Sequence, residues 1–143
     1  MTNAPKITVK TAVGAPITDV WQSYVSPQDI MKWNAASDDW HTTSASVDLR
    51  EGGLFSSRME AKDGSMGFDF AGTYTKIIPH KLIAYSFGER TAEVEFAETA
   101  AGVRVRVTFD AESTNTLEMQ KGGWQAILAS FKCYVETNAA SSV

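Results

Sequence analysis

The feature that most constrains the fold is a pair of alternating segments in the second half of the chain, residues 92–97 and 103–109. In both, apolar side chains such as Val94 and Val105 occupy every second position, and most of the positions between them are charged or polar. Successive residues of a strand point to opposite faces, so each segment has one dry face and one wet face. That pattern is typical of an antiparallel sheet with solvent on one side.

Five earlier segments are also strand-like, and turn signals separate several of them. They cover approximately residues 7–13, 40–49, 55–59, 68–74 and 82–87. The dipeptide Asp63-Gly64 is a strong hairpin signal, because glycine readily adopts the positive φ angles that such turns need. Gly52-Gly53 interrupts the alternation in a similar way. Together with the last pair, these segments predict a sheet of about seven strands.

Two short segments between the first and second strands have helical spacing instead. Pro16 is well placed in a first helical turn, and the apolar residues behind it, up to Tyr24, follow the spacing of one helix face. Pro27 begins a second short helix that extends to about Trp33. We therefore expect two short helices at this point of the chain.

A long helix with one apolar stripe follows the last strand. The stripe consists of Leu117, Trp124, Ile127, Leu128, Phe131 and Val135. With Asn115 as its cap, the helix would cover residues 116–137 and extend about 33 Å, roughly the length of a ten-residue strand. It is therefore long enough to lie across the concave face of the sheet. Gly122-Gly123 lowers its helix propensity, and close approach of another element would explain that pair.

The resulting fold class is α+β, with a curved antiparallel sheet around a long C-terminal helix. At 143 residues the chain is of ordinary single-domain size, and it contains no internal repeat and no low-complexity linker. We therefore expect residues 1–143 to form a single domain.

Composition excludes several classes of function. The formal net charge of −4 argues against a nucleic-acid partner, which would need clustered Lys and Arg. No segment approaches the roughly 20 apolar residues of a membrane span, and the N-terminus has no export signal. The single cysteine, Cys133, cannot form an internal disulfide, which fits a reducing compartment. We expect a cytoplasmic monomer or small homo-oligomer.

The sequence supplies no recognisable catalytic or metal-binding motif. His41 and His80 lack metal-ligand spacing, and we expect both to be surface or packing residues. No Ser-His-Asp order or nucleophile elbow is present. Arg104 and Arg106 share one face of a predicted strand, and we expect them to form cross-strand ion pairs with glutamates of the preceding strand, Glu93 and Glu95. We assign no catalytic residue, no metal and no cofactor.

The order of elements and several short motifs give the chain a family resemblance. The motifs are Pro16 to Trp21, Pro27 to Trp33, Val47 to Gly53, Gly72-Thr73-Tyr74 with Pro79 behind it, and Gly123-Trp124 followed by Ile127-Leu128. In this order and spacing the whole chain resembles the START-like or SRPBCC superfamily, also called the helix-grip or birch-pollen-allergen fold. Within that superfamily it resembles single-domain members of the family of activator of heat-shock-protein-90 ATPase homologues.

The resemblance implies a hydrophobic cavity between the sheet and the long helix, used by relatives for lipids, polyketides or other apolar molecules. Large apolar and aromatic side chains are the candidates to line it: Trp33, Trp40, Phe55, Met59, Phe68, Phe70, Tyr74, Tyr85, Phe87, Trp124, Leu128 and Phe131. Ser57, Tyr74 and Tyr85 would supply polar groups if strand parity turns them inward. The same residue types also dominate solid cores, so the sequence is compatible with a lined cavity and with a filled core.

Our hypothesis is a binding protein for a small lipid-like or polyketide-like molecule, without catalysis. One alternative is an enzyme of polyketide cyclase or hydrolase type on the same scaffold, which a cavity group with a strongly shifted pKa would favour. Another is a protein-interaction module of the stress response with the chaperone as partner, which a large exposed apolar patch without a cavity would favour. We see no second, N-terminal chaperone-binding domain and expect no stimulation of a chaperone ATPase by this chain alone.

Overall fold

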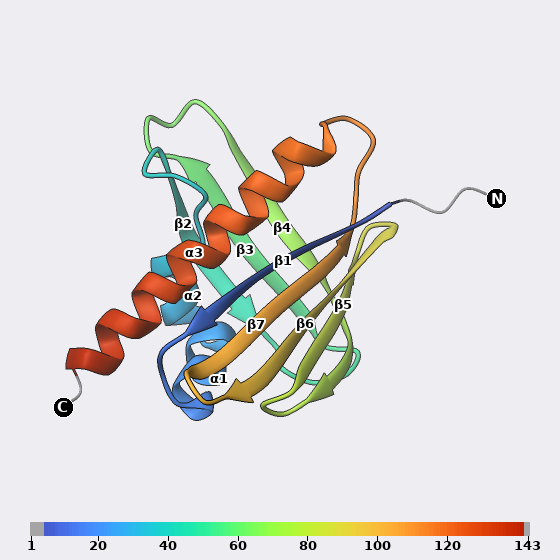
Figure 1. The fold of residues 1–143 in the computed structure, drawn as a ribbon. Helices are drawn as coiled ribbons and strands as arrows, with labels where there is room; N and C mark the ends of the chain where they lie inside the picture. The colour runs from blue at the N-terminus through green and yellow to red at the C-terminus, as the bar shows by residue number, and fades with distance from the viewer. Residues whose placement is uncertain (1–4, 142–143) are drawn as a thin grey trace.

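Alternating strands and one long helix build the architecture seen in the computed structural model, which describes residues 5–141 (Figure 1). The first elements are β1 (Lys6–Val13), α1 (Ile17–Val25), α2 (Pro27–Trp33), β2 (Trp40–Val47) and β3 (Leu54–Ala61). They are followed by β4 (Gly67–Ile78), β5 (Leu82–Phe87), β6 (Arg90–Thr99), β7 (Gly102–Asp110) and α3 (Leu117–Ser141). The predicted order of one strand, two short helices, six strands and a long helix is confirmed.

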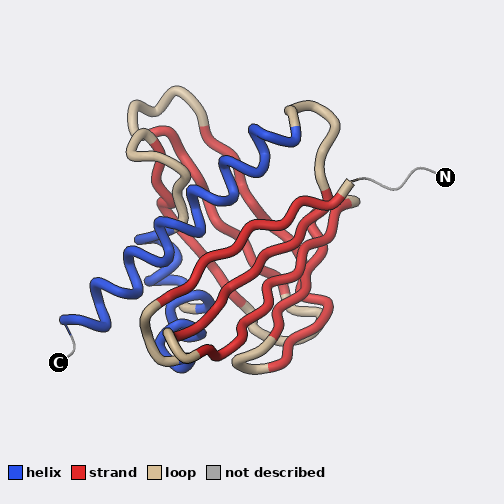
Figure 2. The backbone as a smooth tube through the Cα atoms, viewed as in Figure 1, coloured by secondary structure: helices blue, strands red, loops and turns tan. Residues whose placement is uncertain are grey.

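All strands of the described residues belong to one antiparallel sheet, with the order β1-β7-β6-β5-β4-β3-β2. The first and second strands of the chain are therefore the two edges of the sheet, and α1 and α2 connect them. Figure 2 shows the sheet curling around α3, with α1 and α2 together at one end of it. The predicted α+β class, with a curved sheet around the C-terminal helix, is confirmed.

The alternation in β6 and β7 produces the dry and wet faces that it predicted. Val94 and Val105 are fully buried on the inner face. On the outer face, Arg106 lies opposite Glu95, and an Arg106 Nη donates to a carboxylate oxygen of Glu95 at 2.7 Å. The expected cross-strand ion pair therefore forms here, whereas Arg104 lies opposite Ala97 rather than a glutamate.

The β3–β4 hairpin contains the predicted Asp-Gly turn, in which Gly64 has φ +80° and the Ser65 amide donates to the Asp63 carboxylate at 2.8 Å. Gly72 on β4 has a different role. A Cβ at this position would lie 2.2 Å from the Ser86 carbonyl oxygen and 2.8 Å from the ring of Phe55. Only glycine leaves room here for both the Ser86 carbonyl group and the ring of Phe55.

The start of α3 differs from the expectation. Thr116, not Asn115, caps the helix, because its Oγ1 accepts a hydrogen bond from the Met119 amide at 3.1 Å. Gln120 in the first turn fastens the preceding loop: its Nε2 donates to the carbonyl oxygens of Glu112 and Asn115, and its Oε1 accepts from the Glu112 amide at 2.8 Å. The loop before α3 is thus held against the helix.

The glycine pair in α3 does not mark a close contact. A Cβ added at Gly122 or at Gly123 would meet no atom within 4 Å. The expectation of close backbone approach is therefore wrong. Packing is tight instead farther along the helix, where Phe131 is fully buried with its ring centroid 4.9 Å from that of Trp33 and 5.1 Å from that of Tyr24.

No helix within residues 5–141 has the length and apolar character that crossing a bilayer requires.

Candidate functional site

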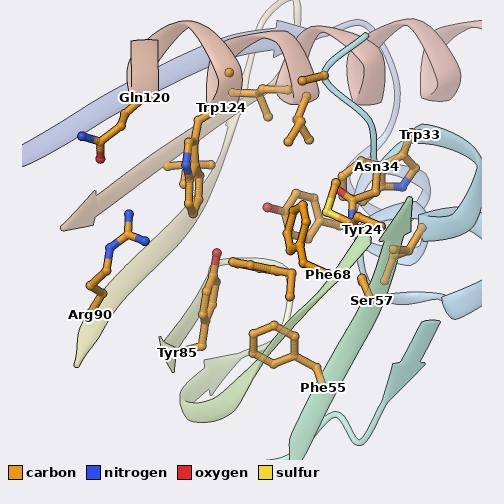
Figure 3. A pocket seen from close by; sticks show the side chains of 18 of the residues that line it. Tyr24, Trp33, Asn34, Phe55, Ser57, Phe68, Tyr85, Arg90, Gln120 and Trp124 are labelled. Atoms are coloured by element: carbon orange, nitrogen blue, oxygen red, sulfur yellow. The ribbon is translucent and has the colours of Figure 1, made fainter. Parts of the chain in front are cut away.

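A cavity of about 480 Å³ lies between α3 and the inner face of the sheet. Side chains of α1, α2, α3 and of strands β2 to β7 contribute to its wall, together with the loop before α3 (Figure 3). This volume falls within the usual range of small-molecule sites. The space exists because α3 packs closely on α1 and α2 through Phe131, whereas Gly123, nearer its N-terminus, presents only a hydrogen atom to the sheet.

Most of the side chains predicted from the sequence lie in the wall of this cavity. They are Trp33, Trp40, Phe55, Met59, Phe68, Phe70, Tyr74, Tyr85, Trp124 and Leu128. Phe87 and Phe131 lie behind the wall instead: Phe87 packs against Phe70 and Trp124, and Phe131 packs against Trp33 and Tyr24. That these residues contact a ligand stays a prediction.

Strand register explains why the aromatic side chains share one face. Ser57 on β3 lies opposite Phe70 on β4, and Tyr74 on β4 lies opposite Tyr85 on β5. Residues two apart on a strand point to the same side, so the inner face receives the ring of Phe55 as well. Its centroid lies 5.0 Å from the ring centroids of both Tyr74 and Tyr85. Ser57, Tyr74 and Tyr85 all line the cavity, so the condition under which they would supply its polar groups is met.

Trp124 forms the helix side of the wall. One face of its indole stacks on Phe109 with ring centroids 3.8 Å apart and planes 11° from parallel. Its remaining exposed surface borders the cavity, opposite Tyr85 in Figure 3. The side chain therefore belongs to the core on one side and to the cavity on the other.

Three tyrosine hydroxyls are among the polar groups of the cavity. Burial raises the pKa of Tyr74 to about 12, and it raises the pKa values of Tyr24 and Tyr85 further, with the other tyrosines adding to the effect. All three phenols are therefore protonated at neutral pH. All three side chains line the cavity, so their hydroxyls can donate hydrogen bonds to a ligand there.

Arg90, at the start of β6, is the cavity residue that the sequence analysis missed. Its Nε donates to the Asp110 carbonyl oxygen at 3.0 Å, and its guanidinium carbon lies 4.6 Å from the centroid of the Phe87 ring. The signal was present: Arg90 is two residues before Ala92, which is 2% exposed, so alternation assigns a charged residue to the dry face. Glu112, Asn115 and Gln120 also line this end of the cavity and were not predicted.

Both histidines lie outside this wall, and the described residues form no cluster that could hold a metal ion. His41 and His80 are exposed, and His80 packs edge-on against Trp21 outside the cavity. Within the described part of the chain, no group of three or more His, Cys, Asp or Glu residues could hold a metal ion. What the wall offers a ligand is apolar contact with its aromatic rings and hydrogen bonds from its polar side chains.

Comparison with known proteins places these features in a family. The model of the family described as "Activator of Hsp90 ATPase homolog 1-like protein" matches residues 14–136. The solution NMR structure of an AHSA1-like protein from Aeromonas hydrophila is 44% identical with a TM-score of 0.89, over 94% of each chain. A solution structure from Cytophaga hutchinsonii is 43% identical with a TM-score of 0.77, over 96% of this chain and 94% of that one.

More distant structures share the fold alone. A crystal structure from Nitrosomonas europaea has a TM-score of 0.81 at 21% identity, over 94% of this chain and 96% of the other. Among curated proteins, none matches the chain.

Proposed function

Because the chain belongs to the activator of Hsp90 ATPase homolog 1-like family, we propose that it binds a small hydrophobic molecule in the cavity between the sheet and α3. The observation that carries the proposal is the cavity itself: it has a volume of about 480 Å³ and a wall of aromatic rings that includes three tyrosines. Sites for small apolar ligands combine large apolar walls with a few convergent polar groups. A solid core would leave no such volume.

An enzyme on the same scaffold has less support. The pKa values of Tyr74 and Tyr85 are shifted, but upward, and so away from the neutral range in which a general acid or base works best. A phenol held in its neutral form can donate a hydrogen bond to a ligand oxygen, but it is a poor proton shuttle. Binding without proton transfer is the function that this direction of shift supports.

A chaperone-contact role also has less support than ligand binding. The most exposed large apolar side chains, Leu54, Met66 and Met119, are 64–66% exposed and belong to three different elements or loops. An apolar patch without a cavity would have favoured a protein partner, and here the apolar surface is concentrated inside the molecule.

Binding of the neutral fluorescent probe N-phenyl-1-naphthylamine tests the proposal. We expect saturable enhancement of its fluorescence by the wild type at one site. Gly123→Leu should abolish it, because a side chain at Gly123 projects into open cavity space without meeting another atom within 4 Å. Gly122→Leu is the matched control, since Gly122 is exposed and lies outside the cavity wall, and it should bind as the wild type does. Equal binding by both variants, or no binding by the wild type, would contradict the proposal.

A further inference from the structure

We propose that Arg90 binds the anionic head group of the ligand, so that the molecule this cavity takes is an amphipathic carboxylate rather than a neutral apolar compound. The inference rests on the proposed function and specifies its ligand class. It follows from where the Arg90 side chain lies, from what already contacts it, and from the distribution of polar groups along the cavity.

The guanidinium of Arg90 is held in place through its Nε atom and its flat face, whereas its two Nη groups are available to a ligand. Its Nε donates to the Asp110 carbonyl oxygen at 3.0 Å, and the group rests 4.6 Å from the Phe87 ring centroid. These two contacts orient the planar fork. Within residues 5–141, no carboxylate lies at ion-pair distance from Arg90, and no protein acceptor pairs with its Nη atoms. A positioned guanidinium with free Nη groups matches the two oxygens of a carboxylate.

Asp110, whose carbonyl oxygen Arg90 contacts, and Glu112, which lines the cavity, both have carboxylates with other hydrogen-bond partners. The Asp110 carboxylate accepts from Lys6 Nζ at 2.6 Å and from the amide and hydroxyl of Thr91 at 2.8 and 3.0 Å. The Glu112 carboxylate, which also lines the cavity, accepts from the Asn115 amide at 2.5 Å. Arg90 is therefore a half-buried cation without a counter-charge from the described chain, and such a group is costly unless a partner satisfies it.

The positive charge lies at one end of the cavity. Figure 3 shows Arg90 and Tyr85 on one side, with Trp33 and Phe68 on the far side beside the neutral side chains of Asn34 and Ser57. Arg90 also acts on the pKa of Tyr85, lowering it against the larger effect of burial, so its charge lies near that hydroxyl. A carboxylate at this end could accept from Arg90 and Tyr85 together, while an apolar tail extends toward Trp33.

A matched pair of ligands separates the head group from the tail. Decanoate and decan-1-ol share a chain length and differ in the charged group, and each is titrated against bound N-phenyl-1-naphthylamine at neutral pH. We expect the wild type to prefer decanoate by about 10- to 100-fold, the factor that a charge-assisted hydrogen bond supplies. Arg90→Gln should reduce this preference to about twofold or less while leaving the affinity for decan-1-ol within about twofold, since the apolar contacts remain.

Two further variants act as controls. Arg104→Gln makes the same change of net charge at an exposed position on the outer face of β7 and should keep the preference for decanoate. Glu112→Gln removes a carboxylate from the wall and should raise the affinity for decanoate relative to that for decan-1-ol. Equal wild-type affinity for both ligands, or a preference that survives Arg90→Gln, would overturn this inference and leave the proposed function standing. If neither compound displaces the probe, and the probe itself does not bind, both fail.

Discussion

Replacing Trp124 with alanine separates the contribution of the core from that of the cavity wall. One face of the indole stacks on Phe109 at 3.8 Å, and its edges approach the rings of Phe70 and Phe87, each with centroids 6.1 Å away. The rest of the side chain borders the cavity and has no protein contact to lose. A fully packed tryptophan costs about 3–5 kcal/mol when it is truncated to alanine, so we expect Trp124→Ala to lower the free energy of unfolding by only about 2 kcal/mol.

Phe131→Ala is the matched control for this substitution. Phe131 lies on the same helix but is 0% exposed and lies outside the cavity wall. Phe131→Ala should lower the free energy of unfolding by the amount expected for a fully packed aromatic residue, about 3–5 kcal/mol. Probe affinity, measured on the folded fraction, should stay within about twofold for Phe131→Ala and fall about tenfold for Trp124→Ala, which loses an aromatic contact with the ligand.

Urea denaturation followed by circular dichroism measures both variants without relying on tryptophan fluorescence. If Trp124→Ala lowers stability as much as Phe131→Ala does and leaves probe binding unchanged, then Trp124 is an ordinary core residue and our description of the wall is wrong.

Four other substitutions test separate parts of the structure. Gly122→Ala and Gly123→Ala should each raise the free energy of unfolding by about 0.5–1 kcal/mol, because alanine favours the helix and no atom obstructs its Cβ. A lower melting temperature of either variant would contradict this. Asp110→Asn should lower stability by about 1 kcal/mol at pH 7 but not near pH 2. The hydrogen bond from Lys6 holds the pKa of the folded-state Asp110 carboxyl below its unfolded-state pKa. The carboxylate therefore stabilises the fold at pH values above the unfolded-state pKa, and this stabilisation is lost as pH falls through the folded-state pKa. A stability difference between wild type and Asp110→Asn that does not change with pH would refute the assignment. Tyr85→Phe keeps the ring and removes a hydroxyl that borders the cavity, so it should leave stability within about 0.5 kcal/mol and should weaken decanoate binding about threefold or more in probe displacement. Unchanged binding would exclude the Tyr85 hydroxyl from the site.

The sheet could be predicted because its information is local. Apolar and polar residues alternate in β6 and β7, and Asp63-Gly64 specifies a hairpin through the backbone freedom of one residue. Parity also placed Phe68, Phe70 and Tyr74 on one face of their strand, and all three line the cavity. These features depend on neighbours along the chain or across one turn, so a single sequence is enough to read them.

Which residues line the cavity depends on contacts between distant parts of the chain, and no local sequence pattern shows these contacts. Phe87 has the same parity as Tyr85, yet Trp124 and Phe70 cover it, whereas Tyr85 faces open space. Gly123 was interpreted as a close contact, although it borders a void. Parity gives the face on which a side chain lies, but not whether a helix or a space lies opposite. Arg90 directly follows the turn at Gly88–Glu89, and its alternation with Ala92 gives its face but not that the cavity extends to it.

The most direct measurement of the central claim is the position of a bound ligand. Isotope-edited NMR on the labelled protein with unlabelled decanoate gives distances between ligand protons and individual side chains. We predict intermolecular contacts from the terminal methyl group of decanoate to Trp33 and Met59, and contacts from the methylene groups near its carboxylate to the indole of Trp124. Contacts confined to exposed side chains such as Leu54 and Met66, or none at saturating ligand, would contradict binding inside the cavity.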